Sequence, residues 1–183
     1  MIRLSLPLGD EEARSLRAGD RVLLSGVLLT GRDAAHKRLV ELMERGGALP
    51  VDLSGQTIYY VGPCPAAPGR VIGSAGPTTS GRMDVYTPRL LDAGLKGMIG
   101  KGPRSRAVID AIMRNGAVYF AAIGGAGALL ARAIKEARVV AFGELGPEAI
   151  YRLRVEDFPV TVAVDANGAD LYSIGRNSYR RHA

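Results

Sequence analysis

The sequence predicts a mixed α/β fold, with helices packed on a mixed sheet in a single domain spanning 1–183. Three observations support this fold class. Short β-like and helical segments alternate through the middle of the chain, as in the units that build a parallel sheet. Meandering β-like segments stand at both ends, which favours some antiparallel pairing. No internal repeat, low-complexity segment or long linker divides the chain, so one domain is expected.

The first third of the chain is predicted to alternate strand and helix. Its elements are a strand over 2–6, a helical turn over 9–19, a strand over 21–25 and a helix over 33–45. Ile2, Leu4 and Leu6 alternate with polar residues, as in a strand with one buried face. Asp33 can cap the helix, and the two glycines at 46–47 end it.

The middle third continues the alternation. Its predicted strands cover 57–61, 70–72, 95–99, 117–123 and 138–142, and its predicted helices cover 84–93, 105–114 and 126–136. A proline-rich turn at 62–65 separates the first two strands, and the Asn-Gly pair at 115–116 stops a helix.

The last third is predicted to be all strand, with segments at 151–155, 160–164 and 171–174. An Asn-Gly pair at 167–168 is a strong hairpin signal, so the last two strands are expected to pair with each other.

Composition excludes several classes of protein. With 47% hydrophobic and 23% charged residues, the chain is not a disordered tail. Its apolar runs are short, and none approaches the ~20 residues of a membrane helix. The first five residues lack the basic and apolar regions of a secretory signal, so a cytoplasmic location is expected.

The cysteine count and the charge point to partners. Cys64 is the one cysteine, so there is no internal disulfide, and the several thiolates of an iron-sulfur or zinc site would have to come with a partner. The net charge of +6 suggests nucleic acid, an anionic metabolite or an acidic subunit. Scattered basic residues and the lack of Trp argue against nucleic acid. Most cations are Arg, which suits carboxylate binding.

The stretch Gly-Ser-Ala-Gly-Pro-Thr-Thr-Ser-Gly-Arg-Met-Asp at 73–84 is the most unusual in the chain. Small and hydroxyl residues between a strand and a helix can expose backbone amides to an anion, and Arg82 adds a fixed charge. The alternative is an extended helix cap, in which Thr78, Thr79 or Ser80 satisfies the first helical amides. Both interpretations stay open on the pattern alone.

Other polar and glycine-rich positions carry weaker signals. Lys101 stands between two glycines after a predicted strand. Both a lysine that binds a carboxylate and a solvated loop lysine are compatible with this position. The turn at 123–130 lacks the third glycine of a dinucleotide fingerprint, because Leu130 holds its place, so close packing is the favoured use. His36 and His182 lack an identifiable nucleophile, and His36 is expected to make a structural hydrogen bond.

Taken together, these residues resemble the iron-sulfur hydro-lyases, in particular class I fumarase C-terminal domains and L(+)-tartrate dehydratase β subunits. The resemblance covers nearly the whole chain, and its most specific motif is Gly-Pro-Thr-Thr-Ser-Gly-Arg-Met-Asp at 76–84. Its other motifs are Thr-Gly-Arg-Asp-Ala-Ala-His at 30–36, Tyr-Tyr-Val-Gly-Pro at 59–63, Met-Ile-Gly-Lys-Gly at 98–102, Gly-Gly-Ala-Gly-Ala-Leu at 124–129, Glu-Leu-Gly-Pro-Glu-Ala at 144–149 and Val-Glu-Asp-Phe-Pro at 155–159.

The resemblance implies a swivelling β/β/α domain and the reversible hydration of fumarate to L-malate, or the corresponding reaction of L(+)-tartrate. It also implies a [4Fe-4S] cluster held by the cysteines of a partner α subunit, in a hetero-oligomer of the α2β2 type. A chain with one cysteine agrees with a cluster located on that partner. A binding module for an anionic metabolite or nucleic acid, without the partner, is the alternative from another functional class.

Carried over by motif, the resemblance implies a site for a C4 dicarboxylate substrate. Arg32, Arg82 and Lys101 would bind the two carboxylates, and Thr78 and Thr79 would lie at the reacting carbons. The resemblance points to Thr78 as a candidate base. Because a Thr hydroxyl is a poor base by itself, that role requires a neighbouring carboxylate, which the α subunit would supply.

Overall fold

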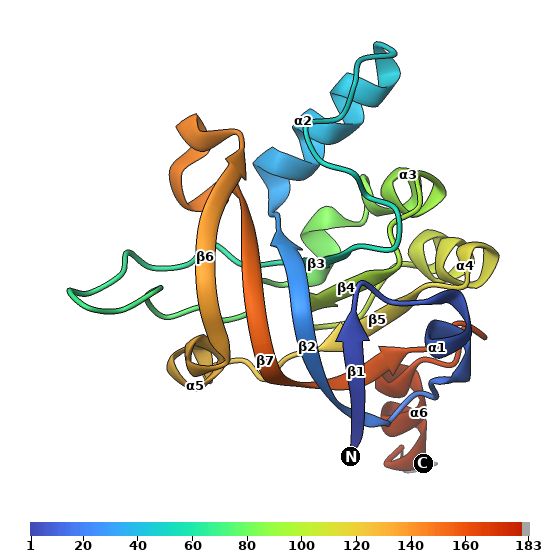
Figure 1. Ribbon diagram of the computed structural model, residues 1–183. Coiled ribbons are helices and arrows are strands. Elements are labelled where there is room, and N and C mark those ends of the chain that lie inside the picture. Colours follow the sequence, from blue (N-terminus) through green and yellow to red (C-terminus); the bar gives the residue numbers. More distant parts are fainter. Residues whose placement is uncertain (181–183) are drawn as a thin grey trace.

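The computed structural model describes residues 1–180, in which strands and helices stack in three layers (Figure 1). One layer consists of β1 (Ile2–Leu6), β2 (Arg21–Thr30), β7 (Ile150–Val164) and β6 (Ile134–Ala141). The next consists of β3 (Thr57–Tyr59), β4 (Gly97–Gly100) and β5 (Val118–Ala121). Helices α2 (Asp33–Glu44), α3 (Thr87–Asp92) and α4 (Arg106–Asn115) pack outside these three strands. The prediction of a mixed α/β fold is confirmed.

The sheet is mixed, as predicted, and its pairings close on themselves. Strands β2, β3, β4 and β5 are successive parallel neighbours. The 15-residue strand β7 runs antiparallel to both β2 and β5, so it joins the two ends of this parallel set. Strand β1 continues the sheet beside β2, and β6 continues it beside β7. The carboxyl ends of the four parallel strands therefore meet at one edge.

Two hydrophobic clusters separate the layers, and the strands alternate between them. Tyr59, Ile99 and Phe120 belong to the cluster between the two strand layers. Ile58 and Met98, with their side chains on the opposite face, belong to the cluster under α2, α3 and α4. Burial of one large apolar side chain contributes roughly 1.5–3 kcal/mol, so strands buried on both faces anchor the molecule.

The two strands predicted at 151–155 and 160–164 are one continuous strand, so that part of the prediction is wrong. The local pattern breaks at Asp157, whose φ is +48°, and the register with β2 shifts nearby. Pairing with β2 nevertheless resumes at once, because Val155 lies opposite Gly26 and Phe158 opposite Leu24. The strand is irregular at this point but does not end.

The strand predicted at 171–174 is also wrong, because these residues begin helix α6 (Leu171–Ser178). The turn at Gly168 forms as predicted, with φ of +83°, but it leads to a helix. The Asp170 side chain accepts a hydrogen bond from the Tyr172 amide at 3.0 Å and so caps the helix. An isolated bridge between Val164 and Asp170 takes the place of the expected hairpin.

Other predicted boundaries shift. Residues 70–72 lie in a loop. The helix predicted over 84–93 begins only at Thr87, as α3 with Pro88 in its first turn, and a 3₁₀ turn η1 (Ser80–Met83) precedes it. Strand β2 extends past residue 25 to Thr30. The remaining elements are α1 (Asp10–Ser15), α5 (Gly127–Arg132) and η2 (Gly143–Glu148). His182 and the end of the predicted 1–183 domain lie outside the described residues.

Candidate functional site

The predicted site residues lie on loops that leave the carboxyl edge of the parallel strands. Arg32 follows β2, the segment containing Thr78 follows the turn after β3, and Lys101 directly follows β4. Ligand sites of open α/β sheets form at this edge, because loops from neighbouring strands converge there. The topology therefore gathers residues that are up to 69 positions apart in the sequence.

Backbone hydrogen bonds join the Thr78 segment to Lys101. The Thr78 amide donates to the Tyr60 carbonyl at 2.7 Å, the Ser80 amide donates to the Lys101 carbonyl at 2.9 Å, and the Lys101 amide donates to the Thr78 carbonyl at 3.3 Å. Thr79 and Lys101 form an isolated parallel bridge. The structure thus brings three of the predicted site residues, Thr78, Thr79 and Lys101, side by side.

The threonine hydroxyls do not act as helix caps. Thr79 is the N-cap of η1, yet its side chain makes no capping hydrogen bond. The hydroxyl of Ser80, by contrast, is bonded to the Tyr119 hydroxyl at 2.8 Å in the buried interior. The extended-cap interpretation of this segment is therefore wrong for Thr79, and its hydroxyl has no capping role to fulfil.

Arg32 and Arg82 both lie beside the Asp33 carboxylate. Arg82 Nε donates to Asp33 Oδ1 at 3.0 Å, and Arg82 Nη2 lies 2.9 Å from Asp33 Oδ2 in an ion-pair contact. Asp33 Oδ2 has no hydrogen-bond partner within residues 1–180. Arg32 Nε lies 4.0 Å from Asp33 Oδ2. The Arg82 side chain is 51% exposed and that of Arg32 24% exposed, so Arg82 faces solvent more openly.

A second acid holds the other side of Arg32. Arg32 Nη2 lies 3.3 Å from Glu148 Oε1, and the other oxygen of Glu148 accepts from the Ala34 amide at 3.1 Å. A Cβ atom at position 62 would lie 2.8 Å from Arg32 Nη1, so Gly62 leaves room for the guanidinium in its present position. The buried Nε of Arg32 makes no hydrogen bond within residues 1–180.

Lys101 differs from these two arginines. Its side chain is exposed and forms no ion pair with any residue of the described chain, whereas Arg32 and Arg82 each have an acidic neighbour. Its methylene chain passes Gly124, where a Cβ would approach Lys101 Cδ to 3.5 Å. The site therefore holds two arginines whose charge is compensated and one lysine whose charge is not.

His36 lies fully buried beneath Arg32. Its Nδ1 is 2.8 Å from the Arg32 carbonyl oxygen, the structural hydrogen bond that the sequence analysis expects. Burial lowers the pKa of His36 to about 4, so the ring is neutral at pH 7 and Nδ1 carries the donated proton. The ring packs edge-on against Tyr60 at 5.2 Å, and His36 thereby fixes the backbone from which Arg32 extends.

Sequence reasoning missed Arg104 and Asp84, which lie under the same loops. Arg104 has a fully buried side chain, and its Nε lies 2.7 Å from Asp84 Oδ1. Burial acts to lower the pKa of Arg104, but Tyr60 and Asp84 beside it raise that pKa above its ordinary value, so the guanidinium stays charged. In the sequence, Arg104 follows a proline in a loop and looks like any surface arginine.

The glycine-rich turn after β5 serves close packing, as the sequence analysis favours. The Ala75 amide donates to the Gly127 carbonyl at 3.1 Å. A Cβ at position 127 would overlap the Ser74 hydroxyl and lie 2.9 Å from the Gly76 amide nitrogen. This contact supports the start of the 76–84 motif from below.

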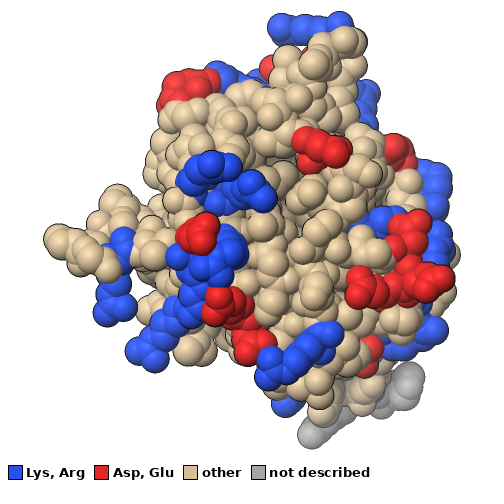
Figure 2. Space-filling model, in the orientation of Figure 1, with Lys and Arg blue, Asp and Glu red and all other residues tan. Residues whose placement is uncertain are grey.

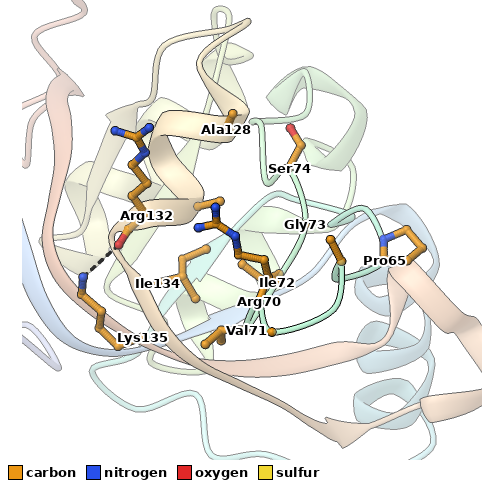
Figure 3. A pocket seen from close by; sticks show the side chains of 13 residues that line it. Pro65, Arg70, Val71, Ile72, Gly73, Ser74, Ala128, Arg132, Ile134 and Lys135 are labelled. Atoms are coloured by element: carbon orange, nitrogen blue, oxygen red, sulfur yellow. Dashed lines mark hydrogen bonds between the residues drawn. The ribbon is translucent and has the colours of Figure 1, made fainter.

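A separate cavity of about 690 Å³ lies between the loop at 65–74 and the segment from α5 into β6 (Figure 3). Its charged lining residues are Arg70, Arg132 and Lys135, and no acidic side chain lines it. The Lys135 ammonium donates to the Arg132 carbonyl at 2.9 Å. None of the five predicted site residues lines this cavity.

Surface charge is interspersed. On the face drawn in Figure 2, Lys and Arg side chains lie among Asp and Glu side chains. Arg154, for example, pairs with both Glu136 at 2.7 Å and Glu156 at 2.6 Å. On this face the mixture lacks the one-signed patch typical of a nucleic-acid interface.

Metal ligands do not gather in the described part of the chain. Within residues 1–180, no three His, Cys, Asp or Glu side chains come together as a metal site, and Cys64 is exposed. These residues do not fit an iron-sulfur cluster, which takes several thiolates. No helix among the described residues has the length and apolar character needed to cross a bilayer.

Comparison with known proteins identifies a family. The family model described as "Fumarase C-terminus" matches residues 1–175. The chain is 43% identical over 157 residues to "Fumarate hydratase 2" of Leishmania major, a match that covers 85% of this chain and 28% of that protein. It is 44% identical over 154 residues to "Fumarate hydratase class I, aerobic" of Escherichia coli, covering 83% and 28%.

A third relative differs in length. The chain is 37% identical over 171 residues to "Putative L(+)-tartrate dehydratase subunit beta" of Methanocaldococcus jannaschii, a match that covers 90% of this chain and 88% of that protein. The chain therefore spans only 28% of the two fumarate hydratases but most of this subunit.

Proposed function

The chain belongs to the family of fumarase C-terminal domains, and we propose that it is the β subunit of a class I iron-sulfur fumarate hydratase. In this proposal it supplies the dicarboxylate-binding half of a site that catalyses the reversible hydration of fumarate to L-malate. A cysteine-bearing α subunit supplies the [4Fe-4S] cluster and the other half, in a hetero-oligomer of the α2β2 type. The described residues of this chain do not fit the cluster.

The contact between Arg82 and Asp33 carries the proposal. Arg82 already binds a carboxylate through one hydrogen bond and one ion-pair contact, and Arg32 lies beside the same group. This geometry supports recognition of a substrate carboxylate at the two arginines, with Asp33 as the group that keeps them in place. Lys101, whose charge is uncompensated in the described chain, is proposed to bind the second carboxylate.

Thr78 and Thr79 are proposed to lie at the reacting carbons. Both are next to Lys101 through the backbone bonds of this segment, and the Thr79 side chain is not used as a cap. Thr78 is the candidate base for the proton removed from malate. Its hydroxyl would pass that proton to a carboxylate of the α subunit, because an isolated Thr hydroxyl holds its own proton too tightly.

The L(+)-tartrate dehydratase reaction is the second candidate. The relative named as a tartrate dehydratase subunit is matched over most of its own length, unlike the longer fumarate hydratases. Tartrate and malate are both C4 dicarboxylates that lose a hydroxyl, so Arg32, Arg82 and Lys101 would serve either substrate.

Substrate comparison in the assembled enzyme tests the proposal. The chain is co-expressed with its α subunit under anaerobic conditions, and loss of water from L-malate and from L(+)-tartrate is followed. We expect kcat/KM to be at least about tenfold higher for malate. The reverse preference would assign the tartrate reaction. A folded complex inactive on both substrates would favour the binding module.

A further inference from the structure

The loops that carry Arg82 and Lys101 rest on a buried polar cluster. This cluster, called the support layer below, consists of Tyr60, Ser80, Asp84, Thr87, Arg104 and Tyr119. The Arg104 side chain is 0% exposed and that of Asp84 12% exposed. A charge taken out of water is stabilised only when its surroundings satisfy it, so the contacts of Arg104 are informative.

Each of the three nitrogen atoms of the Arg104 guanidinium has a polar partner. Nε donates to Asp84 Oδ1 at 2.7 Å, and Nη2 donates to Thr87 Oγ1 at 2.9 Å. Nη1 is 3.4 Å from the Tyr60 hydroxyl and 3.6 Å from Met98 Sδ. The guanidinium also lies over the rings of Tyr60, at 5.3 Å, and Tyr119, at 4.9 Å.

Asp84 connects the two loops through both of its oxygens. Besides Arg104, it accepts a hydrogen bond from the Ser105 amide at 2.6 Å. In sequence, Asp84 comes two residues after Arg82, and Arg104 comes three residues after Lys101. The ion pair between Asp84 and Arg104 is therefore a short link between the segment that carries Arg82 and the loop that begins at Lys101.

A second link lies on the other side of the support layer. The Ser80 hydroxyl is bonded to the Tyr119 hydroxyl at 2.8 Å, and the Tyr119 hydroxyl lies 2.8 Å from the Gly102 carbonyl oxygen. Ser80 directly follows Thr79, and Gly102 directly follows Lys101. The same two loops are thus tied at two points, and Tyr119 also lies under Arg104.

We infer that Arg104 is a positioning residue, which through Asp84 sets the distance between the Thr78–Arg82 segment and Lys101 and so the spacing of the substrate's two carboxylates. The substrate part of this inference rests on the proposed function. The loop-ordering part does not, because it concerns contacts within this chain. A rigid support for binding groups is needed because small displacements of such groups weaken ligand recognition strongly.

A purely fold-stabilising role is the competing explanation, and paired substitution separates the two. Replacing a buried ion pair by uncharged residues of similar volume often leaves stability nearly unchanged, whereas removing one partner leaves a bare buried charge. The test variant is therefore Arg104→Met combined with Asp84→Asn. Arg104→Lys is a second variant that retains the charge but loses the planar fork, in case the double variant fails to fold.

The chain offers a matched control. Arg114 and Asp92 form an ion pair at 2.8 Å near the carboxyl ends of α4 and α3, the helices that follow Arg104 and Asp84, and both side chains are exposed. Arg114→Met combined with Asp92→Asn makes the same chemical change away from the site.

Amide hydrogen exchange of the folded chain is the first measurement. The Ser80 and Lys101 amides are hydrogen-bonded between the two loops, and the Thr78 amide donates to the Tyr60 carbonyl of the support layer. We expect exchange at these three amides to become at least about tenfold faster in the Arg104 and Asp84 double variant, with the amides of β2 and β7 unchanged. In Arg104→Lys the same three amides should also exchange faster than in the wild type. The control pair should not change them.

Steady-state kinetics of the assembled enzyme on L-malate is the second measurement. The double variant should raise KM at least about tenfold, more than it lowers kcat, while the control pair stays at the wild-type values. Unchanged exchange at the three loop amides in both Arg104 variants would overturn the inference, as would exchange that rises equally throughout the chain. A wild-type complex inactive on C4 dicarboxylates, with the local exchange response intact, would refute the proposed function and leave the positioning role standing.

Discussion

Asp33 orients the side chains of Arg32 and Arg82. Arg82 Nε donates to one oxygen of Asp33 at 3.0 Å and Arg82 Nη2 lies 2.9 Å from the other, so this carboxylate orders the guanidinium before a ligand arrives. Glu148 fixes Arg32 in the same manner from the other side. Ordering of long side chains in advance reduces the entropy that binding would otherwise cost. These carboxylates therefore explain how exposed arginines can form a defined site.

Replacing Arg82 by Lys tests the two-donor geometry. Arg82→Lys keeps the charge but cannot reproduce a planar grip on a carboxylate, so kcat/KM of the assembled enzyme should fall at least tenfold, or ~1.4 kcal/mol. The melting temperature should stay the same, because the side chain is half-exposed. Arg89→Lys is the control, since Arg89 pairs with Glu44 elsewhere on the surface. Wild-type kinetics of Arg82→Lys would remove this residue from the site.

Substitution of Thr78 distinguishes a role in the reaction from a role in the local structure. We expect Thr78→Ala to lower kcat roughly 10²-fold with KM and melting temperature nearly constant, the usual scale for a positioned acid-base group. Thr79→Ala is the comparison, and it should raise KM more than it lowers kcat. Steady-state kinetics and a thermal melt of both variants check this. If Thr78→Ala melts early but turns over normally, the base must be sought on the α subunit.

His36 makes stability depend on pH. Burial lowers the pKa of its ring from 6.5 to about 4, so below pH 6.5 the unfolded chain binds a proton that the folded chain refuses. Its contribution to stability is therefore complete above pH 6.5 and is lost as the pH falls toward 4. Linkage gives a loss of about 2 kcal/mol between pH 7 and pH 5. Denaturant unfolding at both pH values should show that loss in the wild type and a smaller one in His36→Gln. Equal losses would show that His36 is not the group responsible.

Sequence patterns identified the exposed site residues more readily than the buried ones. Arg32, Arg82 and Lys101 stand in glycine-rich motifs where a charge has no role in the core, which is a visible signal. Arg104 carries no such signal, and Asp84 ends the 76–84 motif without any sign of its buried partner. Their burial depends on the packing of α3 and α4 over β4, and a local sequence window does not contain that packing.

Among the elements, the close approach of the Thr78 segment to β4 depends on a glycine. A Cβ at position 100 would overlap the Ser80 hydroxyl and lie 2.9 Å from Tyr60 Cδ2. Gly100 therefore allows the segment to lie directly on the strand end. The sequence patterns of the strand and of the loop do not reveal this contact, because Gly100 and Ser80 are 20 residues apart in sequence.

Substitution of that glycine should be costly. Gly100→Ala forces the segment at 78–80 away from β4, and overpacking of this kind should reduce the free energy of unfolding by about 2 kcal/mol. Gly81→Ala is the matched control, because no atom lies within 4 Å of its added Cβ. Denaturant titration with an unchanged m-value measures both. A Gly100→Ala chain as stable as the wild type would mean that the segment moves without strain.

Errors in predicting the elements have a common physical origin. The break expected near Asp157 failed because β2 pairs with β7 on both sides of it, and such long-range pairing overrides a local turn signal. At Asp170, a side-chain cap selected a helix over the strand suggested by the apolar residues that follow. The strands predicted at 57–61, 95–99 and 117–123 and the helix predicted at 105–114 lie close to their actual places, but the helix predicted over 126–136 ends at Arg132 and β6 begins at Ile134.

At the scale of the whole molecule, the parallel order of β2, β3, β4 and β5 collects the site at one edge, and β7 closes this set by pairing with both β2 and β5. The sequence patterns predicted a mixed sheet but did not predict this closure. The site that results is open to solvent, with Lys101 and Arg82 exposed. An open half-site fits a proposed reaction that proceeds only when a second protein surface covers the substrate and excludes water.

Iron content and fumarate hydration, measured for the chain alone, the α subunit alone and the anaerobic mixture, test this half-site most directly. We expect the chain alone to be colourless, free of iron and inactive, because its single thiol cannot hold a cluster. Activity should appear only in the mixture. An iron-free preparation of this chain that hydrates fumarate by itself would contradict the proposed division of the active site between two subunits.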